Sequence, residues 1–305
     1  MNERVIQFGE AKSLVGVLAE PSGGVAQGPT VILLNAGTLH RIGPHRVYVK
    51  IARALAAAGF PAFRFDLSGL GDSLPRRDNL PYAASSVCET QAAMDFLYAD
   101  NATRQFILMG FCGGADAAFR VACREARVVG AALIDWFAYR TMGWYVHHYR
   151  SAFASFWASR QFLPGDGASG STTRNHATSA GRPRGKVMND GEVPSKAQSA
   201  ADLTALIGRD VHLLFVYTGA QLAYYNYRGQ LRDVFRSVPF RDQVEVDFHP
   251  QADHTLTLLH HQQRLVDRIH RWATGVAWGE QRTSRALAGS SSLKYVDSRT
   301  SQSPA

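Results

Sequence analysis

The sequence predicts an α/β fold in which helices cover both faces of a mostly parallel β-sheet. Short apolar runs bounded by glycine, proline or small residues alternate with segments of helical periodicity along the chain. Parallel strands need long connections, and these are usually helices. The chain has 305 residues, 46% of them hydrophobic, so it can bury one large core.

The strands are expected at the apolar runs, which are residues 5–8, 14–19, 30–35, 61–66, 105–110, 128–135, 211–217 and 244–249. A helix is expected from about residue 46, because Tyr48, Ile51, Ala52 and Leu55 share one face and Gly59 can end it. Further helices are expected over residues 83–98, 115–126 and 255–272.

One insertion interrupts this alternation. We expect residues 1–135 and 206–278 to form the two parts of one core, with residues 136–205 inserted between them and a disordered tail at 279–305. The insertion begins with many aromatic residues, which predict either a helical lid over a site or helices packed on the sheet. Residues 165–200 are rich in Gly, Ser, Thr and Pro and predict a mobile loop.

Charge and cysteine content exclude several classes of protein. Five of the eight excess positive charges lie in residues 165–200 and 281–305, which favours solvated basic segments over a nucleic-acid footprint. No apolar run is long enough to predict a membrane span, and the first residues do not resemble a signal peptide. Three cysteines without a C-x-x-C pair predict neither a disulfide framework nor a metal site. We therefore expect a cytoplasmic protein that needs no cofactor.

The most informative motif is Gly110-Phe111-Cys112-Gly113-Gly114, which lies between an apolar run and a helix-compatible segment. A nucleophile at such a sharp strand-to-helix turn is exposed at the sheet edge, and the flanking glycines prevent collisions across the turn. The amides at the start of the next helix favour a thiolate and a developing oxyanion. Cys112 could instead be a small buried hydrophobic residue, but the glycines on both sides argue against this.

Four segments in this order resemble the α/β-hydrolase superfamily. They are residues 35–38, similar to the oxyanion loop; residues 66–73, similar to a D-x-x-G-x-G-x-S turn; the Cys112 motif; and residues 252–254, where the histidine is expected. Residues 41–46 and 51–55 are similar to hydrolases associated with bacterial exosortase and exopolysaccharide gene clusters. The resemblance covers residues 30–135 and 211–272 and leaves out the lid and tail.

The resemblance implies that Cys112 is the nucleophile and that His254 is the general base, about 140 residues further along the chain. The backbone of Gly113, with that of Thr38 or Gly37, would form the oxyanion hole. Asp66 and Asp72 are assigned to structure, because their turn is expected to lie under the site and to cap or brace it. Phe111, Trp136 and Tyr139 are expected to contact an apolar acyl chain or ring of the substrate.

The third member of the site departs from the common pattern, because no acid lies within the few residues after 211–217, where the chain continues with residues 218–222. Asp135, at the end of the preceding strand, could orient His254, or it could be a helix cap. Gln221 could be a neutral partner of the imidazole, as the amide is in Cys-His-Asn enzymes. The site could also be a Cys–His dyad.

Two classes of function follow. The first is a hydrolase of esterase or thioesterase type, or an acyltransferase, that forms a thioester at Cys112 with an ester, thioester or amide substrate. This small acyl substrate is either free or attached to a carrier. The second is a non-catalytic binding protein that kept the fold and lost the acid. Dehalogenase and epoxide hydrolase chemistry is excluded because both need an aspartate at position 112. Dinucleotide binding is excluded because no strand leads into G-x-G-x-x-G.

Overall fold

The computed structural model describes residues 1–22, 28–101, 103–150, 193–278 and 294–295. Within these residues the strands form one sheet in the order β1-β2-β4-β3-β5-β6-β7-β8-β9. The strands are β1 (Asn2–Phe8), β2 (Leu14–Glu20), β3 (Thr30–Leu34), β4 (Ala62–Asp66), β5 (Phe106–Phe111), β6 (Val128–Ile134), β7 (His212–Thr218), β8 (Val244–His249) and β9 (Lys294–Tyr295). The β1–β2 and β2–β4 pairs are antiparallel and all other described pairs are parallel.

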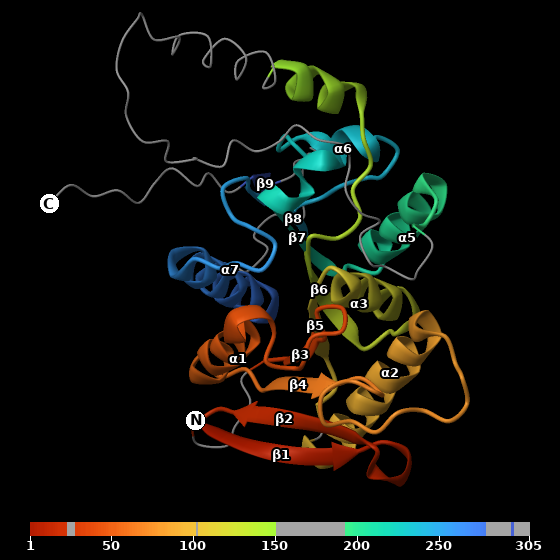
Figure 1. Ribbon diagram of the computed structural model, residues 1–305, viewed down its shortest axis with the longest axis vertical. Helices are drawn as coiled ribbons and strands as arrows, with labels where there is room; N and C mark the ends of the chain where they lie inside the picture. The colour runs from red at the N-terminus through yellow and green to blue at the C-terminus, as the bar shows by residue number, and fades with distance from the viewer. Residues whose placement is uncertain (23–27, 102, 151–192, 279–293, 296–305) are drawn as a thin grey trace, which may run out of the picture.

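Helices cover both faces of the sheet, as predicted (Figure 1). Helices α1 (Val47–Ala57) and α7 (Leu259–Trp278) pack on one face, and α2 (Tyr82–Asn101), α3 (Gly113–Arg124) and α5 (Lys196–Gly208) pack on the other. The core consists of two apolar clusters, one on each face of the sheet. There are two because successive side chains of a buried strand point to opposite faces. Ile32 and Leu108 belong to the cluster with α3, whereas Val31 and Ile107 belong to the cluster with α1 and α7.

The helical periodicity of the first helix is confirmed. Tyr48, Ile51, Ala52 and Leu55 of α1 are all buried. The final helix begins later than predicted, at Leu259, because Asp253 organises the preceding residues as a loop. Its carboxylate accepts hydrogen bonds from the amide of Thr257 at 2.9 Å and from the hydroxyl of Thr255 at 2.7 Å. Such side-chain bonds satisfy the backbone without a helical turn.

Several expectations about the insertion and tail need correction. Helix α5 begins at Lys196, inside the segment expected to be a mobile loop, and Ser195 caps it by accepting a hydrogen bond from the Gln198 amide. Residues 294 and 295, in the expected disordered tail, form β9 beside β8. Residues 142–150 are helical, as expected for the aromatic part of the insertion. The short helix α6 (Gln230–Val234) was not predicted. Most of the predicted lid and loop, residues 151–192, lies outside the described residues.

The carboxyl ends of β5, β6, β7 and β8 lead into Cys112, Asp135, the 3₁₀ helix η3 (Gly219–Ala223) and the loop that carries His254. Parallel strands bring these four segments to the same edge of the sheet. None of the helices described here combines the length and the hydrophobicity that a membrane span requires.

Candidate active site

Cys112 lies at the turn between β5 and α3 in a conformation that L-residues rarely adopt, with φ 50° and ψ −115°. Such strain costs about 1–3 kcal/mol and is retained where the surrounding structure imposes it. A Cβ atom on Gly110 would lie 2.2 Å from the backbone of Gly114, and one on Gly114 would lie 2.4 Å from the carbonyl oxygen of Asn35. The prediction that side chains at these glycines would collide is confirmed.

His254 and Asp135 are in direct contact although 119 positions separate them. The Nδ1 atom of His254 lies 2.6 Å from Oδ2 of Asp135. Asp135 is buried and follows β6 with a left-handed φ of 52°, which turns the chain away from the strand direction. The structure therefore places a carboxylate on the imidazole, although no acid follows β7.

Cys112 also affects the charge state of the imidazole. The hydrogen bond with Asp135 and that with Cys112 raise the pKa of His254 to about 10, although burial opposes the shift. Both neighbours favour the positively charged form of the ring. His254 is thus protonated at neutral pH, between a carboxylate and the sulfur atom.

Thr218, the last residue of β7, holds the carboxylate in place. Its amide donates to Oδ1 of Asp135 and its hydroxyl donates to Oδ2, both at 2.7 Å. The Gln221 amide group instead donates to the backbone carbonyl of Asp135, at 3.5 Å. Gln221 therefore supports the backbone next to the acid, and the hydrogen bond to Nδ1 of His254 comes from Asp135. Sequence analysis did not identify Thr218, although it stands where the common acid position begins.

The loop that carries His254 is attached to the end of β7. The Gly219 amide donates to the carbonyl oxygen of Ala252 at 2.8 Å. Although burial opposes the shift, hydrogen bonds from Thr255 and Thr257 lower the pKa of Asp253 to about 2. The residues on both sides of His254 are therefore fixed by contacts of their own.

Asp66 braces the loop expected to contribute to the oxyanion hole. Its buried carboxylate accepts hydrogen bonds from the Asn35 side chain at 3.0 Å and from the Arg41 amide at 2.6 Å, and it pairs with the Arg41 guanidinium. Between these contacts, Gly37 adopts φ 59° and Thr38 is exposed. Asp66 thus joins both ends of the loop, as its predicted bracing role requires.

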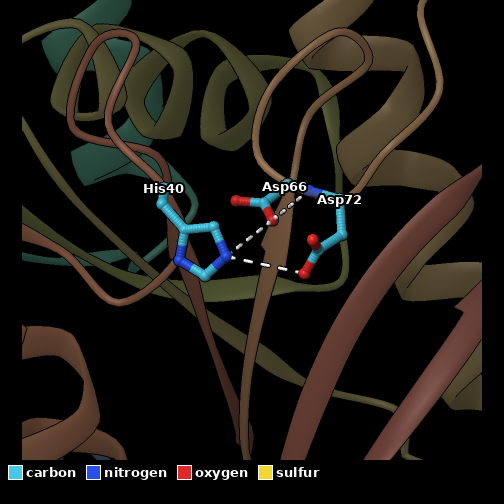
Figure 2. Close-up of side chains that lie close together, drawn as sticks. All are labelled: His40, Asp66 and Asp72. Carbon is cyan, nitrogen blue, oxygen red and sulfur yellow. Dashed lines mark hydrogen bonds and ion pairs between the residues drawn. The ribbon is translucent and has the colours of Figure 1, made fainter.

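His40, Asp66 and Asp72 form a cluster of groups that could bind a metal ion (Figure 2). Nε2 of His40 lies 3.5 Å from Oδ2 of Asp66 and 3.6 Å from Oδ2 of Asp72. However, the Arg41 guanidinium pairs with both carboxylates, at 2.6 Å from Asp72, and its hydrogen bond lowers the pKa of Asp72. Arg41 already supplies the positive charge that a cation would bring, so we assign the cluster to structure.

Tyr48 connects the ends of the two strands that lead into the candidate site, β3 and β5. Its buried hydroxyl donates to the carbonyl oxygen of Leu34 at 2.8 Å and accepts from the amide of Phe111 at 3.1 Å. Leu34 ends β3 before the oxyanion loop, and Phe111 directly precedes Cys112. Sequence periodicity predicted Tyr48 only as a packing residue of α1, and no local pattern indicates this contact.

The expectation that Phe111 and Trp136 contact the substrate is wrong for the structure observed. Both rings are buried: Phe111 packs against Tyr48, and Trp136 packs against Phe119 and Phe215. Aromatic residues at the ends of central strands fill the layers between sheet and helices. Tyr139 is partly buried, and its hydroxyl donates to the carbonyl oxygen of Pro194 at 2.7 Å.

Tyr82, at the start of α2, is a neighbour of the site that sequence analysis missed. Burial of its hydroxyl, with the charges of Asp116 and then Cys112, raises the pKa of Tyr82 to about 12. Its phenol thus remains neutral at neutral pH. No motif around Tyr82 marks it, because only the packing of α2 beside α3 brings it towards Cys112.

A potential nucleophile at a strand-to-helix turn, with an acid and a histidine following it at the same edge of a parallel sheet, defines the α/β-hydrolase fold and its class of enzymes. More specifically, the sequence model of the serine aminopeptidase S33 family matches residues 37–206, over half of the chain, and the protein belongs to this family.

Similar solved structures support the fold. An esterase from Pyrococcus furiosus has a TM-score of 0.57 at 13% identity, with 90% of each chain covered. The esterase domain of a Rhodothermus marinus protein has a TM-score of 0.53 at 17% identity, with 90% of this chain and 98% of that chain covered. A serine hydrolase without a lid from Xanthomonas campestris has a TM-score of 0.52 at 14% identity, with 89% and 94% covered. No curated protein matches the sequence.

Proposed function

We propose that the protein hydrolyses an acyl ester or thioester through a thioester intermediate on Cys112. The observation that carries this proposal is the contact of Oδ2 of Asp135 with Nδ1 of His254 at 2.6 Å, together with the effect of Cys112 on the pKa of the same ring. The non-catalytic alternative depended on a missing acid. The carboxylate of Asp135 on the imidazole removes that argument.

The charge state of His254 suits a cysteine nucleophile. Since the pKa of His254 is about 10, the ring holds a proton at pH 7 and stabilises a thiolate at Cys112. The start of α3 adds the partial positive charge of its free amides. A serine hydroxyl would need a neutral imidazole to take its proton, so this site favours sulfur over oxygen.

In the first half-reaction, the thiolate attacks the carbonyl carbon of the substrate and the carbonyl oxygen becomes an oxyanion. The amide of Gly113, with that of Gly37 or Thr38, stabilises this charge. When the bond to the leaving group breaks, His254 gives its proton to the departing oxygen or sulfur. The products are an acyl thioester on Cys112, the leaving alcohol or thiol, and a neutral imidazole.

In the second half-reaction, neutral His254 takes a proton from water, which attacks the thioester and releases the acid. Cys112 leaves as a thiolate, and the imidazolium is restored. We take water as the acceptor because the matching family and two similar structures are named as hydrolases. The alcohol or thiol that replaces water in acyl transfer would enter at the same step.

A small acyl substrate, free or attached to a carrier, fits this chemistry. The likeness to exosortase-associated hydrolases remains a prediction about its biological setting.

The test is acyl-enzyme trapping by intact mass spectrometry with a panel of p-nitrophenyl esters and acyl thioesters. A Cys88→Ser background removes the exposed thiol, and burial already raises the pKa of Cys123 to about 12. We expect an acyl adduct on Cys112 with the wild-type turnover rate, and neither adduct nor turnover with Cys112→Ala. Wild-type turnover by Cys112→Ala would disprove the proposal.

A Cys112→Ser variant sharpens the test, because it keeps the shape of the residue and restores the nucleophile named by the family. We expect it to be slower at pH 7, because the hydrogen bond with Asp135, the largest cause of the raised pKa of His254, remains in the variant and opposes transfer of the hydroxyl proton to the ring. Equal rates for the wild type and the Cys112→Ser variant would show that sulfur is not required.

A further inference from the structure

Residues 142–150 form a helix with an exposed apolar face. Met142, Tyr145, Val146 and Tyr149 follow the spacing i, i+3, i+4, i+7 and therefore share one side of the helix. Their exposed fractions are 80%, 41%, 54% and 66%. In a globular protein such a face normally packs on the core, and a contiguous exposed one indicates a contact surface. We name these four residues the exposed helix face.

The other side of this helix is fixed to the body of the protein. Trp144 is buried and donates its indole N–H to the carbonyl oxygen of Leu222 at 3.1 Å. The Asn226 side chain donates to the Trp144 carbonyl oxygen at 3.0 Å, and the Arg140 guanidinium lies 4.5 Å from the Trp144 ring centre. The orientation of the exposed helix face is thus set by packing on its opposite side.

Charge around this face is positive. Arg140 and Arg150 flank the helix, and residues 136–150 contain no Asp or Glu. Leu222 and Tyr224, from the segment that Trp144 contacts, are also exposed and extend the apolar surface. A helix with one apolar face and neighbouring arginines has the two features that attract a helix to the interface of an anionic bilayer, which are buried apolar area and positive charge.

The surface lies beside the candidate active site. The helix is anchored to η3, which directly follows Thr218, and Gln221 of η3 contacts the backbone of Asp135. Figure 1 shows the helix, in yellow-green, at the end of the molecule where α6 lies, far from β1. A membrane contact here would leave the edge of the sheet that carries Cys112 near the lipid surface.

We propose that the exposed helix face docks the protein peripherally onto an anionic phospholipid bilayer. A second copy of the chain fits less well, because a symmetric dimer through this face would bring Arg140 and Arg150 of both copies together. Anionic headgroups instead neutralise these arginines while the apolar side chains enter the interface. Docking requires no chemistry at Cys112, so it is independent of the proposed function.

The test compares sedimentation of the full chain with vesicles of phosphatidylcholine alone or mixed with phosphatidylglycerol. Val146→Glu places a charge in the exposed helix face. Val5→Glu is the matched control, because Val5 is 71% exposed on β1 at the opposite end of the molecule. We expect the wild type to bind the anionic vesicles, and we expect salt to weaken this binding. The affinity of Val146→Glu for these vesicles should be about tenfold or more lower than that of the wild type. The affinity of Val5→Glu should be unchanged.

Three outcomes would overturn the proposal: no preference for anionic vesicles, equal binding by the two glutamate variants, or self-association that Val146→Glu abolishes. The last would identify a second copy as the occupant. Circular dichroism verifies that both variants are folded. Cys112→Ala should bind vesicles like the wild type, and this expectation holds whether or not Cys112 forms a thioester.

Discussion

The hydroxyl of Thr218 donates a hydrogen bond to Oδ2 of Asp135 at 2.7 Å, and the same oxygen lies 2.6 Å from Nδ1 of His254. A residue at the end of β7 therefore orients an acid that comes from the end of β6. The two strands are hydrogen-bonded neighbours, so their ends lie at the same edge. The carboxylate can thus come from either strand while the imidazole keeps its position.

Asp135→Asn should reduce kcat/KM by about 10²–10⁴-fold, because an amide does not stabilise the imidazolium as a carboxylate does. Hydrolysis of a p-nitrophenyl ester measures the effect. Asp247→Asn is the matched control, since Asp247 also pairs with a histidine, His249, at 2.7 Å and is buried on β8. It should affect stability but not kcat. Equal losses in kcat/KM would contradict the assignment of Asp135.

Thr218→Val should lower kcat and the free energy of unfolding, the latter by about 1.5–3 kcal/mol for a lost hydrogen bond to a charged group. Valine keeps the shape of threonine but leaves Oδ2 of Asp135 with one donor fewer. Thr218→Ser should recover most of both losses. Urea unfolding and steady-state kinetics give the two quantities. Failure of serine to restore kcat would show that packing, not the hydroxyl, is what matters.

Tyr48→Phe should destabilise the protein by about 1–3 kcal/mol, because it leaves the buried amide of Phe111 without its acceptor and removes the donor to Leu34. The same change should reduce kcat, since both loops next to Cys112 lose their link. Tyr98→Phe is the control, because Tyr98 is exposed on α2. Identical unfolding curves for the two variants would show that the Tyr48 hydroxyl has no structural role.

The contact between His254 and Asp135 should make stability depend on pH. The folded protein holds the pKa of His254 at about 10, well above its ordinary value of 6.5. The contribution is therefore fully present below pH 6.5 and is lost as pH rises towards 10. Urea midpoints of wild type and Asp135→Asn, measured from about pH 6 to about pH 10, should differ most at the acidic end. A difference that grows with pH would mean that the sign is wrong.

Local patterns of the sequence predicted the structure best where they report burial. Apolar runs located the strands from β1 to β8, and Gly110 and Gly114 marked the turn at Cys112 because only glycine tolerates its close backbone contacts. Phe111 and Trp136 were misassigned to the substrate surface for a related reason. An aromatic residue next to a site motif fits a pocket and a core equally well until packing is known.

By itself, the sequence determined the alternating fold, the nucleophile turn and the candidate roles of Cys112 and His254, since each depends on neighbouring residues or on chain order. Only the tertiary structure selected Asp135 over Gln221 as the group on Nδ1 of His254, and only it revealed Thr218, Tyr48 and the exposed helix face. The physical reason is that hydrogen bonds between distant segments depend on strand order and on side-chain direction, and linear spacing encodes neither.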